Sequence, residues 1–413
     1  MAIIKPFKAL RPPKNMAKKV AALPYDVMNV QEARVMATGN SLSFLHVSRP
    51  EIDLPPYLEP HDESVHFKGK LNLEAFIRQG ILIADSVESF YIYRQCMGKI
   101  TQTGIVTCAS VDDYQSGVIK KHEHTRLDKE DDRVRHIDVL DANDEPVFFI
   151  SRSCADIERI ISAATSVPPE YDFVTDDNVA HSIWILNDTD MTCRLTDIFS
   201  KHPRLYVADG HHRSAAAERV REMRRKANPD HTGNEEYNYF LAVIFPEDQL
   251  NIMPYNRVVK DLNGLNIPEF LKEIERAFEI VESPVPISPN IRHNFGMYLD
   301  GRWYHLKLSD SLIDETDAVN RLDVSILQDK LLAPLLGIKD PRTDTRIHFV
   351  GGIRGNTELT KLVDSGEYVV AFSLFPTSVS ELIELADQDQ IMPPKSTWFE
   401  PKLRSGLFVH KLA

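Results

Sequence analysis

The stretch RLYVADGHHRSAAAERV, residues 204–220, contains the patterns of a strand, a turn and a helix in immediate succession. Residues 205–208 form a short apolar run of the kind found in buried strands. Asp209 and Gly210 interrupt this run, and Gly210 can adopt backbone angles that a side chain disfavours. From Ser214 onward the residues favour a helix. We therefore predict a strand that passes through a glycine turn directly into a helix.

Three side chains at the predicted helix start, His211, His212 and Arg213, point to phosphate binding. Backbone N–H groups and the positive end of the helix dipole lie at such a terminus, so Gly210 and these three residues are candidate phosphate-binding residues. Asp209 is a candidate to hold Mg²⁺ or to orient an acceptor. The structural alternative is that the turn is an ordinary one and the histidines only satisfy local hydrogen bonds.

A second dense cluster of His, Asp and Arg occupies residues 118–133. If residues 119–124 are extended, His122 and His124 share one face and Glu123 lies opposite. We expect this cluster to fold within reach of His211. Its candidate phosphate ligands are Lys121, His122, His124, Arg126 and Arg133, and its candidate metal ligands are Asp131 and Asp132. The alternative is a solvated charged loop leading into a helix.

Several residues nearer the two ends of the chain have both a functional and a structural interpretation. Asp26 either lies at the carboxyl end of a strand, where α/β sheets keep their ligands, or caps a helix at about residues 30–36. His46 lies in a segment, residues 43–51, that resembles a strand, where a core role is the plainer expectation. Near the C-terminus Lys395 and Lys402 either line a polar cleft or belong to a strand that covers a sheet edge.

The composition predicts a globular intracellular protein of 413 residues with two or three packed units. The net charge of −13 argues against a broad nucleic-acid surface. Four scattered cysteines fit reduced thiols in a cytoplasmic location. We see no secretory signal, and no window approaches the apolar length of a membrane span. The Pro-rich, acidic loop at 52–63 should lie on the surface.

Alternating strand and helix patterns predict an α/β fold, with α+β as the alternative, built from mixed sheets with flanking helices. We expect an α/β domain at residues 1–263 that carries the Asp-Gly-His-His-Arg site. A smaller α/β domain follows at 264–413, beginning at Gly264, and its C-terminal segment is a candidate to return to the first domain.

Five motifs together resemble one prokaryotic family, known as domain of unknown function 1015. They are PYDV at 24–27, FLHVSRPE at 44–51, KHEHTR at 121–126 with DDR at 131–133, ADGHHR at 208–213 and PKSTWFEPK at 394–402. The resemblance spans the chain, and it brings no established reaction with it.

The DGHHR motif at 209–213 is also similar to that of the ParB/sulfiredoxin superfamily, which includes kinases that phosphorylate free serine. The resemblance implies that this stretch handles nucleotide phosphates and that an acidic residue elsewhere acts as the base. His211 replaces the cysteine of the sulfiredoxins, so repair of sulfinic acid is not expected. In partition proteins a DNA-binding helix-turn-helix module follows this motif, and no such module follows it in this sequence.

From these patterns we predict a phosphotransferase that uses ATP, or another nucleotide, and Mg²⁺ to phosphorylate a small hydroxyl metabolite such as free serine. Asp26 or Glu123 would accept the proton. One alternative is a nucleotide-binding regulator without turnover. Another is a metal-dependent phosphoesterase built on His122, His124, His211 and Asp209. The expected partners are a nucleotide and a small substrate, without nucleic acid or membrane, and a homodimer is among the assemblies open to the chain.

Overall fold

The computed structural model describes residues 1–58 and 62–413, so the predicted surface loop at 52–63 lies partly outside the described residues. The chain forms two compact units. The first contains residues 1–121, 125–250 and 401–413, and the second contains residues 122–124 and 251–400. The chain thus leaves the first unit after Leu250 and returns to it at Pro401. The predicted domain boundary at residue 264 stays a prediction.

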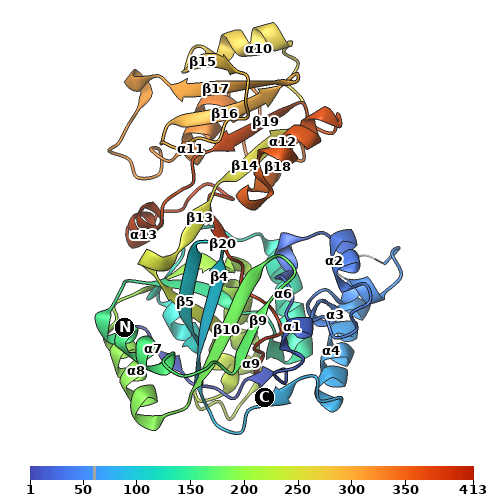
Figure 1. Cartoon of the computed structure of the whole chain (residues 1–413), viewed down its shortest axis with the longest axis vertical. Helices are drawn as coiled ribbons and strands as arrows, with labels where there is room; N and C mark the ends of the chain where they lie inside the picture. Colours follow the sequence, from blue (N-terminus) through green and yellow to red (C-terminus); the bar gives the residue numbers. More distant parts are fainter. Residues whose placement is uncertain (59–61) are drawn as a thin grey trace. The chain divides into compact units, whose positions relative to one another are not determined.

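The first unit is built on a mixed sheet (Figure 1), in which the described residues form nine strands. Eight follow the order β6-β11-β8-β12-β5-β4-β10-β9, and β1 pairs with β5. The pairs β11–β6 and β12–β8 are parallel and the others are antiparallel. The strands are β1 (Ile4–Lys5), β4 (Phe90–Met97), β5 (Ile100–Ser110), β6 (Ile119–Lys120), β8 (Val147–Ser151), β9 (Tyr171–Val174), β10 (Val179–Leu186), β11 (Leu205–Asp209) and β12 (Tyr239–Pro246). This architecture confirms the predicted mixed sheet with flanking helices.

Strand β12 lies in the middle of this sheet because its apolar run supplies buried side chains to both faces. On one face Phe240 and Ile244 join a hydrophobic core that includes Ile157 and Leu195 from the covering helices. On the other face Phe245 packs against Phe148, with ring centroids 4.7 Å apart. Strand β12 is therefore a central strand that is buried on both faces.

Helices surround this sheet, and two short strand pairs lie beside it. The helices are α1 (Ala17–Val20), α2 (Val30–Ala37), α3 (Leu45–Ser48), α4 (Glu63–Arg78), α5 (Val111–Gln115), α6 (Leu127–Leu140), α7 (Ala155–Ala164), α8 (Thr189–Lys201) and α9 (His211–Ala227). The strand pairs are β2 (Leu10–Arg11) with β3 (Ile83–Ala84), and β7 (Ala142–Asn143) with β21 (His410–Lys411).

One local prediction in this unit is wrong, and one of the two alternatives for Asp26 is excluded. Residues 43–51, predicted as a strand with His46, form helix α3 and a following 3₁₀ turn, because a short apolar run fits a buried helix as well as a strand. Asp26 does not cap α2. The cap is Asn29, whose side chain accepts the Glu32 N–H in a reciprocal capping box.

The second unit has its own sheet, in which the described residues form six strands in the order β15-β17-β16-β19-β14-β18. These strands are β14 (Tyr255–Val259), β15 (Phe278–Ser283), β16 (Asn294–Leu299), β17 (Arg302–Leu308), β18 (Ile347–Gly351) and β19 (Val370–Leu374). The other elements are β13 (Asn251–Met253), which pairs with β20 (Trp398–Glu400), and the helices α10 (Ile267–Ile274), α11 (Asp323–Leu327), α12 (Gly355–Asp364) and α13 (Val379–Asp387).

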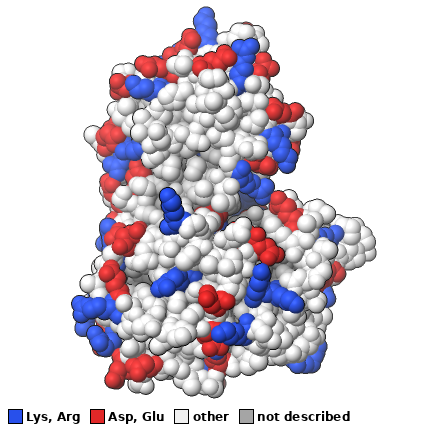
Figure 2. Space-filling model, viewed as in Figure 1, with Lys and Arg blue, Asp and Glu red and all other residues white. Residues whose placement is uncertain are grey.

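No helix within residues 1–58 and 62–413 combines the length and the apolar character needed to cross a membrane. Basic and acidic side chains are interspersed over the visible face of the molecule (Figure 2). Several exposed Lys, Arg, Asp and Glu side chains form ion pairs, and Arg302 Nη1 lies 3.1 Å from Glu282 Oε2.

Candidate functional site

The predicted strand–glycine–helix junction is present between β11 and α9. Strand β11 ends at Asp209, and Gly210 adopts a φ of +99° that a side chain disfavours. Helix α9 begins at His211, and its hydrogen-bond ladder begins where the Ser214 N–H donates to the Gly210 carbonyl at 2.9 Å. The backbone N–H groups of residues 211–213 therefore form the first turn, which is the positive end of the helix.

The Asp209 carboxylate lies between two cations at this junction. Lys402 Nζ contacts Asp209 Oδ2 at 2.9 Å, and Arg213 Nη2 lies 3.7 Å from Asp209 Oδ1. The Asp209 side chain is 23% exposed, whereas those of Lys402 and Arg213 are 9% and 8% exposed. The cations are thus buried behind a carboxylate that retains access to solvent.

Arg213 is buried at the junction. Its guanidinium donates to the Pro146 carbonyl. Burial lowers the pKa of Arg213, but the charges of Asp26, Asp209 and Glu145 raise it by more, so the guanidinium keeps its positive charge. The structure therefore places Arg213 as a support for Asp209.

Glu145 is a buried acid beside Arg213 that the sequence did not indicate. Its carboxylate accepts the Tyr25 N–H at 3.0 Å and the Ser405 hydroxyl at 2.8 Å. Burial raises the pKa of Glu145, the charge of Asp144 adds to this effect, and the charge of Arg213 opposes it. Glu145 thus joins three segments that are distant in sequence at one end of the sheet.

Asp26 follows Tyr25 in a 3₁₀ turn and is exposed. The ring of Tyr25 lies under the Arg133 guanidinium, 4.1 Å from its centroid. Arg133 in turn pairs with Asp132 at 2.6 Å, and both are buried. Arg133 was predicted to bind phosphate and Asp132 to bind metal. In the structure the two side chains form an ion pair with each other.

The other predicted residues of helix α6 and its approach lie on the surface. Asp131 pairs with Arg219 of α9 at 2.6 Å, and the Arg126 guanidinium pairs with Asp128. The Arg126 N–H donates to His212 Nε2 at 3.1 Å. This contact confirms that the upstream cluster folds to the start of α9, while Lys121 lies instead over the ring of Tyr114, 3.8 Å from its centroid.

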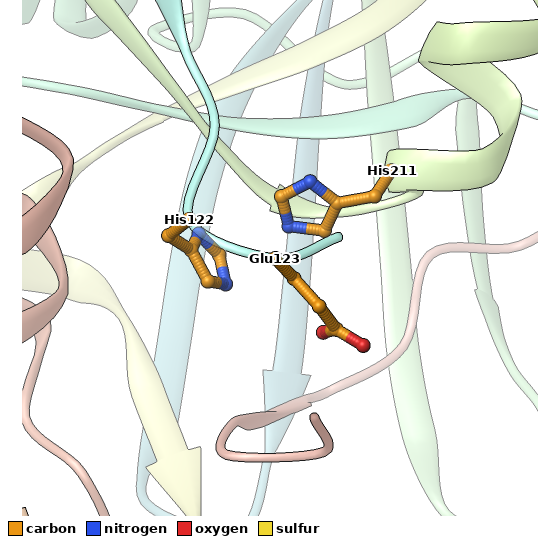
Figure 3. Close-up of side chains that lie close together, drawn as sticks. All are labelled: His122, Glu123 and His211. Atoms are coloured by element: carbon orange, nitrogen blue, oxygen red, sulfur yellow. The ribbon is translucent and has the colours of Figure 1, made fainter. Parts of the chain in front are cut away.

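The expected pairing of His122 with His124 on one strand face is wrong. Strand β6 ends at Lys120, and beyond it His122 is buried whereas His124 is exposed. Figure 3 shows the side chains of His122 and Glu123 beside that of His211. One ligand atom of each residue lies within 4.8 Å of the other two. Two imidazoles and a carboxylate are ligands that Zn²⁺, Mn²⁺ or Fe²⁺ accept. Residues 122–124 are joined at both ends to segments of the first unit.

Comparison with known proteins identifies a family and several distant similarities in fold. A family model described as "Protein of unknown function (DUF1015)" matches residues 4–325. Among the curated proteins, none matches this chain.

Three solved structures illustrate the likenesses in fold. A free serine kinase in complex with AMP has 12% identity and a TM-score of 0.35, with 72% of this chain and 86% of that chain covered. SbnI with C-terminal truncation from Staphylococcus aureus has 13% identity and a TM-score of 0.40, with 74% and 87% covered. A conserved hypothetical protein from Pyrococcus furiosus has 12% identity and a TM-score of 0.34, with 74% and 95% covered.

Proposed function

The chain belongs to the DUF1015 family of proteins of unknown function, and we propose that it is a nucleotide-dependent phosphotransferase for a small hydroxyl metabolite, with free serine as one candidate. The observation that carries this proposal is the Asp209 carboxylate at the start of α9, held by Lys402 at 2.9 Å and backed by Arg213 at 3.7 Å. Phosphoryl transfer depends mainly on fixed positive charge and on positioning, with little covalent chemistry from the protein. A helix start with two buried cations supplies both.

The phosphates of the nucleotide would lie over the first turn of α9, at residues 211–213. His212 is half-buried there, and its ring already contacts the backbone of Arg126. Arg213 and Lys402 would act from below, through Asp209 and through their charge. The similarity of the DGHHR motif to the ParB/sulfiredoxin superfamily agrees with this arrangement and remains part of the proposal.

The residues predicted to hold Mg²⁺ do not favour a dedicated ion site. Asp131 contacts Arg219, Asp132 contacts Arg133, and Asp209 contacts Lys402. Each carboxylate already has a cationic partner, so we derive no step through Mg²⁺. Any Mg²⁺ in the reaction would arrive with the nucleotide, as is usual for phosphate-bound magnesium.

Asp26 is the proposed base for the hydroxyl proton. It is exposed at the turn next to Tyr25, and its charge acts on the Arg213 guanidinium. Glu123 remains the alternative base, because it lies beside His211.

Formation of ADP from ATP tests the proposal directly, with free serine and a panel of hydroxyl metabolites as acceptors. We expect acceptor-dependent ADP formation that Asp209→Asn lowers by about a hundredfold or more, with smaller loss of nucleotide affinity. Asp190→Asn, a change at an exposed position in α8, is the matched control and should leave the rate unchanged.

Two outcomes would replace the proposal. Saturable ATP or CTP binding without turnover of any acceptor would favour the regulator. Release of phosphate from a phosphoester without an acceptor would favour the phosphoesterase.

A further inference from the structure

A cavity lies at the end of the first unit's sheet opposite the β11–α9 junction, and we propose that it binds a small monocarboxylate with a short apolar chain. Its volume is about 230 Å³. Ser151 and Pro246 line it at the carboxyl ends of the parallel strands β8 and β12. Asp209 pairs with Phe148, near the opposite end of β8. The cavity is therefore separate from the site at α9 and does not depend on the proposed function.

The cationic group of this cavity is Arg94 of β4. Its guanidinium lies over the Trp184 ring, 4.9 Å from the centroid, and its Nε donates to Thr103 Oγ1 at 3.2 Å. Within the described part of the chain, no carboxylate pairs with Arg94. The ring and the hydroxyl thus fix the plane of the guanidinium, while its two terminal nitrogens remain available for a ligand.

A planar guanidinium held in this way matches the two oxygens of a carboxylate. Because the fork is already oriented, a ligand does not need to order a flexible side chain on binding. Unpaired guanidinium nitrogens at a cavity wall are therefore the feature that selects an oxyanion here.

The remaining walls define the rest of the ligand. Ile157 and Ile161 of α7 and the ring of Pro246 form an apolar surface, and the buried Ser151 adds a hydroxyl. Glu158, exposed at the rim, disfavours a dianion such as phosphate through like-charge repulsion. At about 30 Å³ per water, the cavity equals roughly eight waters, which suits a ligand of about six to eight non-hydrogen atoms.

Calorimetric titration of the full chain with isovalerate tests this inference, with isovaleramide as the neutral isostere. We expect saturable one-to-one binding of isovalerate, and at least about tenfold weaker binding of the amide. Arg94→Gln should weaken isovalerate binding by about ten- to a hundredfold. Arg159→Gln, a change in the exposed part of the same helix α7, should leave it unchanged.

A second variant keeps the test decisive if Arg94→Gln fails to fold. Ile161→Trp retains the guanidinium but fills the cavity, so it should abolish isovalerate binding while the protein stays folded. Equal binding of acid and amide would overturn the inference, as would tighter binding of inorganic phosphate. Absence of saturable heat up to about 20 mM isovalerate would overturn it as well.

Discussion

Gly210 offers the sharpest test of how the β11–α9 junction is built. At a φ of +99°, an alanine would carry a conformational strain of about 1–2 kcal/mol. Its Cβ would also lie 3.0 Å from Arg213 Nε and 3.1 Å from Arg213 Cζ. The guanidinium would have to shift, and overpacking of this kind costs about 1–3 kcal/mol. We therefore expect Gly210→Ala to lower the free energy of unfolding by about 2–5 kcal/mol.

Gly80 provides the matched control within the same unit. It has a φ of +69°, and a Cβ built there has no neighbour within 4 Å. Gly80→Ala should therefore show only the conformational strain, about 1–2 kcal/mol. Urea titrations of both variants, followed by tryptophan fluorescence, measure the difference. Equal losses for the two variants would refute the claim that Arg213 fills the space above Gly210.

Two further predictions concern ion pairs in the first unit, Lys402 with Asp209 and His46 with Asp53. Lys402→Met leaves the Asp209 carboxylate without its nearer cation, so we expect a loss of about 1–3 kcal/mol in urea titrations. The same change should cost much less when Asp209→Asn is already present, and additive losses would contradict the pairing. The hydrogen bond that His46 Nδ1 donates to the Asp53 carboxylate raises the pKa of His46 against the effect of burial. Burial raises the pKa of Asp53, but the hydrogen bonds that Asp53 accepts from His46 and Asn72 and the nearby positive charges lower it by more. The stability that protonated His46 contributes is fully present below the pKa that His46 has in the unfolded chain. It is lost as the pH rises through the raised pKa of His46 in the folded protein, and Asp53 is ionised across this range. His46→Gln should therefore cost about 0.5–1.5 kcal/mol at pH 5 and less at pH 8, and an equal or larger cost at pH 8 would exclude this explanation.

Local sequence was sufficient to predict the junction at Gly210. An apolar run, a glycine and a helix-favouring segment are adjacent in the chain, and each acts through its nearest neighbours. The same kind of information failed for residues 43–51, because a short and mostly apolar run fits a short helix and a strand equally. It also failed for Asp26, since Asn29 stands closer to the start of α2 and completes a capping box with Glu32.

The support of the candidate site could not be predicted, because it depends on contacts between distant segments. Lys402 and Asp209 are 193 positions apart, and the sequence indicated Lys402 only as a polar residue near the C-terminus. Arg133 belongs to a charged run that resembles a solvated or ligand-binding segment, yet it is buried over Tyr25. A charged residue is placed in a core by the groups around it, and the Asp209 carboxylate below Lys402 and the Tyr25 ring below Arg133 both come from distant stretches of sequence.

The return of residues 401–413 to the first unit has a consequence for how the protein is made. A ribosome synthesises residues 1–250, and then residues 251–400, before it reaches Lys402 and Ser405. Until then Asp209 and Glu145 lack the amine and the hydroxyl that they bind in the finished chain. Since N-terminal segments fold first during synthesis, the β11–α9 end of the sheet has to wait for residues 401–413. A nascent chain halted at residue 400 should therefore be cut by protease near this junction, at sites that are protected once residues 401–413 are present.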